Sequence, residues 1–395
     1  MAGNQREIAR SEKRLKKDKR NKKIVWIIIA VIIVILVIMK VCEININSVK
    51  DHFTDENGNF TLTEGVVEDH YPYTIDASRD VFMSNINNRI GVLTPNSFTV
   101  IDSSDAQTEY VFEHGYSNPL MKSSGVYSLV YDQGGNTYRL DTTSDAVYER
   151  EVSNSILCAD VSKNGTAAIA TTSNETVCDV YAYNKSLKEL LKVSISYGYA
   201  VDIAVSDNGK KVSVVCINSE NANLKTIVYS YEIGYTEPAA VELPQGLITD
   251  IRYSGNNLLV VGDSYAGVIR KNNTYEPIFE QGTIKTTSLC YTPSGELILV
   301  YNKFSNSTEN VISYIKPNGK IKNEITVSGN IKSVSASSNL VSILTNNQII
   351  SYSLSKGEEK NKMQTDDSSK SICQMGNQVF VHRQSLIDRG ADQTE

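Results

Sequence analysis

The chain has 395 residues, of which 41% are hydrophobic and 21% charged, with 23 Gly and 8 Pro. This composition is that of a folded protein and excludes collagen-like, mostly disordered and multi-span membrane proteins. The formal net charge of −6 is the sum of two opposed regions. Residues 1–23 contain ten Lys or Arg and three Asp or Glu, so this segment carries +7 and the rest of the chain carries −13.

An uninterrupted apolar segment follows the basic residues. The sixteen residues from Ile24 to Met39 are all apolar, and as a helix they would span about 24 Å at roughly 1.5 Å per residue. Lys23 and Lys40 can extend toward the two interfaces, so residues 24–42 predict one transmembrane helix. No small-residue cleavage site follows the segment, which favours an uncleaved signal anchor over a removed signal peptide.

The charges beside this segment predict its orientation. Basic residues flanking a span stay on the cytoplasmic side, so residues 1–23 are expected to form a basic cytoplasmic tail. This tail is expected to lie on anionic lipid or, as the alternative, to be solvated and to serve only as a topology signal. The protein is therefore expected in the cell membrane as a single-pass protein, with its C-terminal region extracytoplasmic. No aromatic residue interleaves the basic charges, so the tail does not indicate binding of nucleic acid.

The outer region begins with a polar stalk at residues 43–58 and is periodic from residue 59 to residue 395. Each unit has an apolar strand, a tight turn, a nearly continuous apolar strand, a strand with more alternation and a polar fourth strand. The turns recur every 37 to 46 residues, at Asn88, Gly125, Gly165, Gly209, Gly255, Gly295, Asn339 and Gly376.

Four-stranded units of about forty residues that become more polar outward predict an all-β fold, the β-propeller. Eight turns favour eight blades, and seven blades is the alternative if one turn belongs to a connection. The eighth unit stops at Glu395 before its fourth strand. Because a ring must close, we expect an N-terminal segment, either residues 60–67 or residues 71–77, to fill that outer position.

Three of the turns share a tetrad that starts with Ser or Thr and ends with Gly. Gly165, Gly209 and Gly295 are expected to supply the positive φ of a type I turn with a bulge. The tetrads resemble those of TolB-like bacterial propellers. The only Trp is Trp26, within the predicted span, so the Trp-bearing signature of WD40 repeats is absent from a layout that is otherwise WD40-like.

The whole layout resembles a family of uncharacterised clostridial membrane-anchored proteins that is defined only as a domain of unknown function. That resemblance implies a propeller behind a membrane anchor, and it implies no activity and no functional residues. From the residues themselves we predict no metal site and no cofactor: the four His have no partner at ligand spacing, and no nucleophile elbow or phosphate loop is present.

Three functions are consistent with this organisation. The first is a non-catalytic module that binds or scaffolds a protein of the cell envelope, because propellers present a large rigid rim. The second is a glycan-processing enzyme with paired carboxylates in the central funnel, for which Asp160, Asp202 and Asp250 are the candidates. Their alternative role is to cap the connections between blades. The third is a sensor that requires a separate intracellular partner.

The charge of −13 outside the tail narrows the class of partner. An acidic surface repels nucleic acid and anionic wall polymers, so we expect an envelope protein, with a neutral glycan as the second class.

Overall fold

The computed structural model describes residues 70–77, 79–303 and 309–390. The chain divides into two units, Met1–Val67 and Glu68–Glu395, and the described residues all belong to the second unit. The predicted tail, transmembrane helix and stalk at residues 1–58 lie outside the described residues. Within the described residues, no helix is long and apolar enough to cross a membrane.

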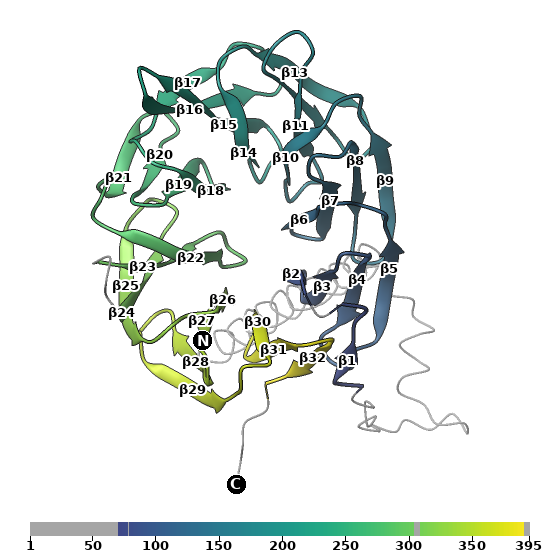
Figure 1. Ribbon diagram of the computed structural model, residues 1–395, viewed down its shortest axis with the longest axis vertical. Helices are drawn as coiled ribbons and strands as arrows, with labels where there is room; N and C mark the ends of the chain where they lie inside the picture. Colours follow the sequence, from purple (N-terminus) through teal and green to yellow (C-terminus); the bar gives the residue numbers. More distant parts are fainter. Residues whose placement is uncertain (1–69, 78, 304–308, 391–395) are drawn as a thin grey trace, which may run out of the picture. The chain divides into compact units, whose positions relative to one another are not determined.

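The described residues form eight four-stranded antiparallel sheets, which are arranged radially as a ring (Figure 1). The predicted β-propeller with eight blades is confirmed, and the alternative with seven blades is wrong. In blades 1 to 7 the strands follow one another in chain order from the inside of the ring to the outside. The connection from each fourth strand therefore leads back to the first, inner strand of the next blade.

The first four blades cover residues 82–242. Blade 1 contains β2 (Phe82–Ile86), β3 (Arg89–Leu93), β4 (Ser97–Asp102) and β5 (Thr108–Glu113), and blade 2 contains β6 (Pro119–Ser124), β7 (Tyr127–Asp132), β8 (Thr137–Asp141) and β9 (Ala146–Glu151). Blade 3 contains β10 (Ile156–Val161), β11 (Ala167–Thr172), β12 (Cys178–Tyr183) and β13 (Glu189–Ile195), and blade 4 contains β14 (Tyr199–Val205), β15 (Lys211–Glu220), β16 (Asn223–Glu232) and β17 (Ala239–Glu242).

The other four blades complete the ring. Blade 5 contains β18 (Ile248–Ser254), β19 (Asn257–Gly262), β20 (Ala266–Ile269) and β21 (Tyr275–Phe279), and blade 6 contains β22 (Lys285–Tyr291), β23 (Leu297–Asn302), β24 (Glu309–Ile315) and β25 (Ile321–Ser328). Blade 7 contains β26 (Ser333–Ala336), β27 (Leu340–Leu344), β28 (Gln348–Ser353) and β29 (Glu359–Gln364), and blade 8 contains β30 (Ser369–Met375), β31 (Gln378–Arg383), β32 (Leu386–Arg389) and β1 (Tyr73–Thr74).

The core lies between neighbouring sheets. Every residue of β19 from Leu258 to Val261 is at most 2% exposed, because both faces of a second strand are covered by adjacent blades. One apolar cluster combines β10 to β13 of blade 3 with β14 to β16 of blade 4. The fourth strand β25 instead alternates between exposed residues and residues that are buried or partly buried. The strands therefore become more polar outward, as the sequence predicts.

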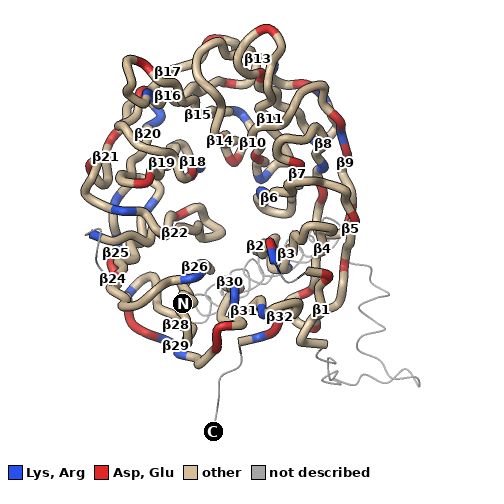
Figure 2. Tube along the Cα trace, viewed as in Figure 1, with Lys and Arg blue, Asp and Glu red and all other residues tan. Residues whose placement is uncertain are grey.

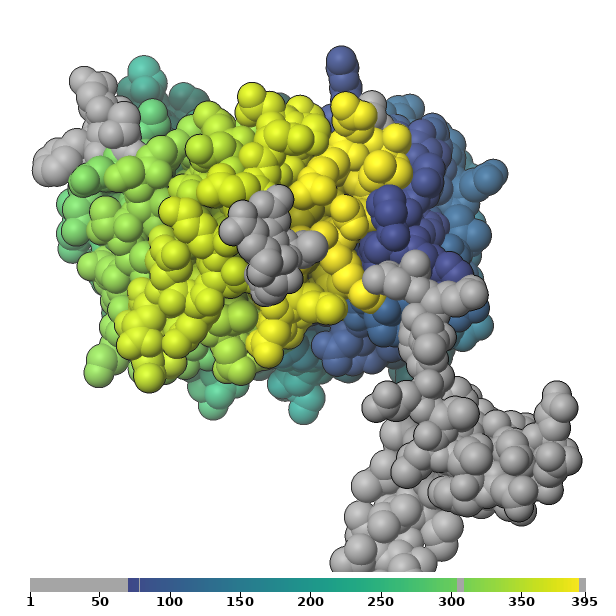
Figure 3. Space-filling model, turned by 90° about the horizontal axis from the view of Figure 1, so that it is seen from below, coloured from purple at the N-terminus to yellow at the C-terminus, as the bar shows by residue number. Residues whose placement is uncertain are grey.

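The ring is closed by both ends of the propeller. In β1, Tyr73 pairs with Ile387 and Thr74 pairs with Leu386 of β32, and the amide of Ile75 donates to the carbonyl of Ser385 at 2.9 Å. The segment at residues 71–77 therefore takes the fourth position of blade 8, whereas residues 60–67 lie outside the described residues. Figure 3 shows the C-terminal strands and the N-terminal part of the propeller side by side on the surface.

The three singled-out glycines all lie in turns between a first and a second strand. Their φ angles are +80° at Gly165, +65° at Gly209 and +88° at Gly295. The amide of each one donates to the carbonyl of the residue that opens its tetrad, at 2.7 to 3.0 Å. A left-handed residue after a type I turn matches the twist of the two strands, so these glycines serve the hairpins.

Candidate functional site

The inner strands surround a central channel with a free volume of about 620 Å³. It is lined by residues of β2, β6, β10, β18, β22, β26 and β30. Several of the inner strands carry charged residues beside this channel (Figure 2). The lining includes charged side chains, among them Lys122, Asp160, Asp250 and Arg252. The channel is therefore a candidate functional site.

The three predicted aspartates lie on three consecutive inner strands, β10, β14 and β18. Oδ2 of Asp160 accepts a hydrogen bond from the amide of Val205 at 2.7 Å. Oδ2 of Asp202 accepts one from the amide of Ile251 at 2.9 Å. Both bonds join one inner strand to the inner strand of the next blade, so these two carboxylates link the inner strands of neighbouring blades.

Asp250 also links two neighbouring blades, but through a hydrogen bond from a side chain. Its Oδ2 accepts a hydrogen bond from the hydroxyl of Tyr291 on β22 at 2.7 Å, and the guanidinium of Arg252 lies 4.8 Å from the centre of the same ring. The carboxylates thus link blades 3, 4, 5 and 6 around the channel wall. The structure brings each predicted aspartate into this one series.

A local irregularity of the strands orients two of the carboxylates. The register with the second strand shifts between Ala200 and Asp202 in β14 and between Ile248 and Asp250 in β18. Each β-bulge adds one residue and redirects the side chains after it. Asp202 and Asp250 directly follow the extra residue, so both occupy the same position in neighbouring blades.

Lys122 on β6 is the member of this cluster that sequence reasoning missed. Its Nζ lies 3.2 Å from Oδ1 of Asp250 and 3.9 Å from Oδ1 of Asp202. Asp250 is 128 residues away in the chain, so no local spacing connects the two. The available signal was the charge itself, because Lys122 is a cation on an inner strand of the ring.

Burial and the charges of this cluster shift the pKa of its members. Burial raises the pKa of Asp202 to about 7, against the attraction of Lys122 and with the help of the repulsion from Asp250. Burial also raises the pKa of Asp160, and Lys122 opposes that change. Burial lowers the pKa of Lys122, but attraction to the carboxylates of Asp250, Asp202 and Asp160 outweighs it and raises the pKa overall. The lysine therefore stays charged while Asp202 titrates near neutral pH.

The arrangement is a filled polar cluster. Lys122 contacts both Asp202 and Asp250, and their other carboxylate oxygens accept hydrogen bonds from Ile251 and Tyr291. A substrate that reached both carboxylates would have to displace the lysine. In the part of the chain that the structure describes, no group of three or more His, Cys, Asp or Glu is placed to hold a metal ion.

A second feature lies where the inner strands of blades 4 and 5 begin. Tyr199 is 69% exposed, Val201 is 42% exposed, and Leu247, directly before β18, is 59% exposed. These two strands are neighbours, because the carboxylate of Asp202 bonds the amide of Ile251. We refer to Tyr199, Val201 and Leu247 as the apolar rim patch. Exposed apolar side chains at the ends of neighbouring strands are a candidate interaction surface.

Comparison with known proteins places the chain in a family. The model of a family of unknown function, DUF5711, matches residues 66–389. The chain belongs to this family. The match covers the propeller described above, and it agrees with the expectation of a domain of unknown function.

No curated protein matches the chain, whereas solved structures do. The C-terminal WD40 domain of Sif2 is 13% identical with a TM-score of 0.57, over 82% of this chain and 98% of that one. Saccharomyces cerevisiae Sqt1 is 10% identical with a TM-score of 0.53, over 81% of this chain and 98% of that one. At these identities the similarity shows a shared WD40-like β-propeller fold and nothing further.

Proposed function

We propose that this protein is a non-catalytic, membrane-anchored module whose extracytoplasmic propeller binds a protein of the cell envelope. The observation that carries the proposal is the apolar rim patch. Its three exposed apolar side chains belong to adjacent inner strands and would lose their contact with water when a partner binds, as the centre of an interface does. The propeller fold supports it, since WD40-like propellers commonly act as protein-interaction modules. The apolar segment at residues 24–42 supports the anchor, and the preceding basic residues support the orientation.

The use of the channel carboxylates also favours binding over catalysis. Asp160 and Asp202 each accept a hydrogen bond from a backbone amide of the next blade. Replacing either carboxylate would therefore first affect the wall of the ring. Because the ring is rigid, its surface loses little conformational entropy when a partner binds. The acidic charge outside the tail favours a partner that is neutral or basic at its contact surface.

The experiment that tests binding is proximity labelling of the full chain in its native cells. We expect one set of envelope proteins to be labelled by the wild type and lost in the double variant Tyr199→Asp, Leu247→Asp. Tyr235→Asp is the matched control, because Tyr235 is 68% exposed in the β16–β17 connection, at the opposite end of the strands. When the purified proteins are mixed, the labelled partner should bind the wild type and the Tyr235→Asp variant, and it should not bind the double variant. Equal labelling by the wild type and the double variant would overturn the proposal.

The proposed anchor and orientation have their own test. In intact cells, a protease added outside should degrade the propeller while an epitope at the N-terminus stays protected in the membrane fraction. Recovery of the full chain in the supernatant after cell lysis, or protection of the propeller, would contradict this part of the proposal.

One observation favours a glycan-processing enzyme as the second candidate. Asp202 and Asp250 lie at one ammonium group, and a carboxyl with a pKa of about 7 could act as a general acid. Asp202→Asn should then abolish hydrolysis of a neutral envelope glycan without unfolding the protein. Absence of hydrolysis by the wild-type protein would exclude this candidate.

A further inference from the structure

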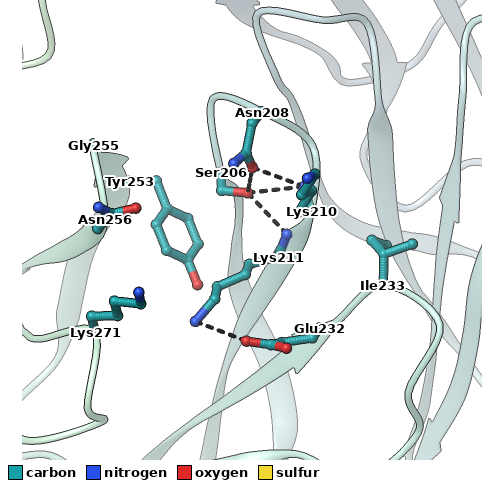
Figure 4. A pocket seen from close by; sticks show the side chains of 10 residues that line it. All are labelled: Ser206, Asn208, Lys210, Lys211, Glu232, Ile233, Tyr253, Gly255, Asn256 and Lys271. Atoms are coloured by element: carbon teal, nitrogen blue, oxygen red, sulfur yellow. Dashed lines mark hydrogen bonds and ion pairs between the residues drawn. The ribbon is translucent and has the colours of Figure 1, made fainter.

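A second cavity lies between the first turns of blades 4 and 5. Its free volume is about 400 Å³, and it is lined by Ser206, Asn208, Lys210, Lys211, Glu232, Ile233, Tyr253, Gly255, Asn256 and Lys271 (Figure 4). That volume lies within the range of roughly 300 to 1,000 Å³ that is usual for small-molecule sites. The cavity is separate from the apolar rim patch, because it lies at the opposite end of the inner strands.

In the neighbouring pair of turns, those of blades 3 and 4, the corresponding space is filled. A Cβ added to Gly209 in blade 4 would lie 2.4 Å from Oγ1 of Thr166 in blade 3. In addition, Nζ of Lys163 in blade 3 pairs with Oδ2 of Asp207 at 2.9 Å. The turns of blades 3 and 4 are therefore in direct contact, with no room for a ligand.

The turn of blade 5 does not make the corresponding contact. Only two residues, Gly255 and Asn256, connect β18 to β19, and a Cβ on Gly255 would meet no atom within 4 Å. Contact resumes at blade 6, where a Cβ on Gly295 would lie 2.8 Å from Oγ of Ser254. The short turn thus leaves an open space between the turns of blades 4 and 5.

The charges around this space are predominantly positive. Three lysines, Lys210, Lys211 and Lys271, line it together with one carboxylate, Glu232. Nζ of Lys211 lies 3.3 Å from Oε1 of Glu232. For Lys210 and Lys271, no carboxylate of the described residues lies within ion-pair distance. Grouped cations in a domain that is acidic overall indicate a site for an anion.

The lysine side chains around the cavity are also oriented so that they could bind one anion together. In Figure 4 the amine ends of Lys211 and Lys271, which come from adjacent blades, both lie toward the hydroxyl end of Tyr253. Tyr253 is only 6% exposed, and its hydroxyl is hydrogen-bonded to Oγ of Ser213 at 2.7 Å. The ring is therefore held in place, and with Ile233 it gives the cavity an apolar part.

We propose that this cavity binds a small organic anion, a carboxylate or a phosphate monoester attached to an apolar body. The anionic group lies between Lys211 and Lys271, and the apolar body packs against Tyr253 and Ile233. Charge-assisted hydrogen bonds to the two ammonium groups provide most of the affinity, and the apolar contacts select against inorganic ions. The proposal does not depend on the proposed protein partner, because it uses different residues.

The test is calorimetric titration of the full chain with phenyl phosphate, phenylacetate and neutral benzyl alcohol at low ionic strength. At least one of the two anions should bind with one-to-one stoichiometry, and at least tenfold more tightly than benzyl alcohol. Comparison of the two anions distinguishes a phosphate ligand from a carboxylate ligand. Added salt should weaken binding, because the site is partly exposed.

Variants locate the binding. Lys271→Ala and Lys211→Ala should each weaken binding about tenfold, as expected when one charged hydrogen bond is lost. Lys320→Ala is the matched control, because Lys320 is an exposed lysine in the corresponding turn of blade 6 and should bind like the wild type. Unchanged thermal unfolding of Lys271→Ala would show that the fold is retained. No binding of either anion at millimolar concentration, or equal binding by Lys271→Ala and the wild type, would overturn the proposal.

Discussion

Lys122 on blade 2 places its ammonium 3.2 Å from a carboxylate oxygen of Asp250 on blade 5. The contact joins two inner strands that are 128 residues apart and that do not belong to neighbouring blades (Figure 1). The ammonium of Lys122 and the two carboxylates stabilise one another. In this partly buried site, a charge without its partner would destabilise the folded protein.

Removal of this ammonium should destabilise the propeller. For Lys122→Met we expect a loss of about 2 kcal/mol in the free energy of unfolding, because Asp250 and Asp202 keep their burial but lose their common partner. Urea unfolding followed by circular dichroism measures the change. Lys332→Met is the control: its partner Asp367 is 91% exposed, so the loss should stay within about 0.5 kcal/mol.

Asp202 should make stability depend on pH near neutrality. Burial raises its pKa in the folded protein to about 7, above the ordinary value of about 4. The folded state therefore binds more protons than the unfolded state between these values, so stability falls as the pH rises through this window.

Thermal unfolding between pH 5 and pH 8 measures this effect. The melting temperature of the wild type should fall more steeply than that of Asp202→Asn, which cannot ionise. The charged groups that act most strongly on Asp202 are Lys122 and Asp250, and Lys122 stays protonated throughout this window because its pKa is raised. The pKa values of the nearby Tyr131, Cys158 and Tyr291 are raised as well, so these groups stay neutral. Identical slopes for the two proteins would show that Asp202 does not titrate there.

The closing strand should contribute to the stability of the whole ring. Ile75 is 8% exposed and packs in one cluster with Phe380 and Ile387, so Ile75→Ala should cost about 2 to 3 kcal/mol. Deletion of residues 59–77 should lower the melting temperature sharply, because it removes the fourth strand of blade 8. Thr74→Ala, at an exposed position of the same strand, should have little effect. An unchanged melting temperature after the deletion would rule out a role in closure.

The two turn glycines should respond differently to the same substitution. Gly209 and Gly255 have nearly equal φ angles of +65° and +61°, so Ala at either position costs about 1 to 2 kcal/mol of backbone strain. Gly209→Ala adds a clash with Thr166, whereas Gly255→Ala adds a methyl group in open space. The difference in unfolding free energy should be about 1 to 3 kcal/mol. Equal losses would mean that the gap beside Gly255 is closed in solution.

Much of the fold was predictable because it depends on local patterns. A second strand such as β19 is covered on both faces, which requires a continuous apolar run. Most of the hairpins between first and second strands have a residue with positive φ in the turn. The same pattern repeated eight times predicted the eight blades. Among the described residues no strand follows β32, and the sequence predicted closure from the N-terminal side, although it left two segments open.

The sites were less predictable because they depend on contacts between distant parts of the chain. The sequence by itself determined the blades, the turns and three candidate aspartates, since each follows from neighbours a few residues away. Only the tertiary structure decided that Lys122 meets Asp250 at the channel wall, and that the short turn at Gly255 leaves an open space beside Lys211 and Lys271. Ring closure sets which inner strands approach each other, and the packing of one blade against the next sets which gaps stay open.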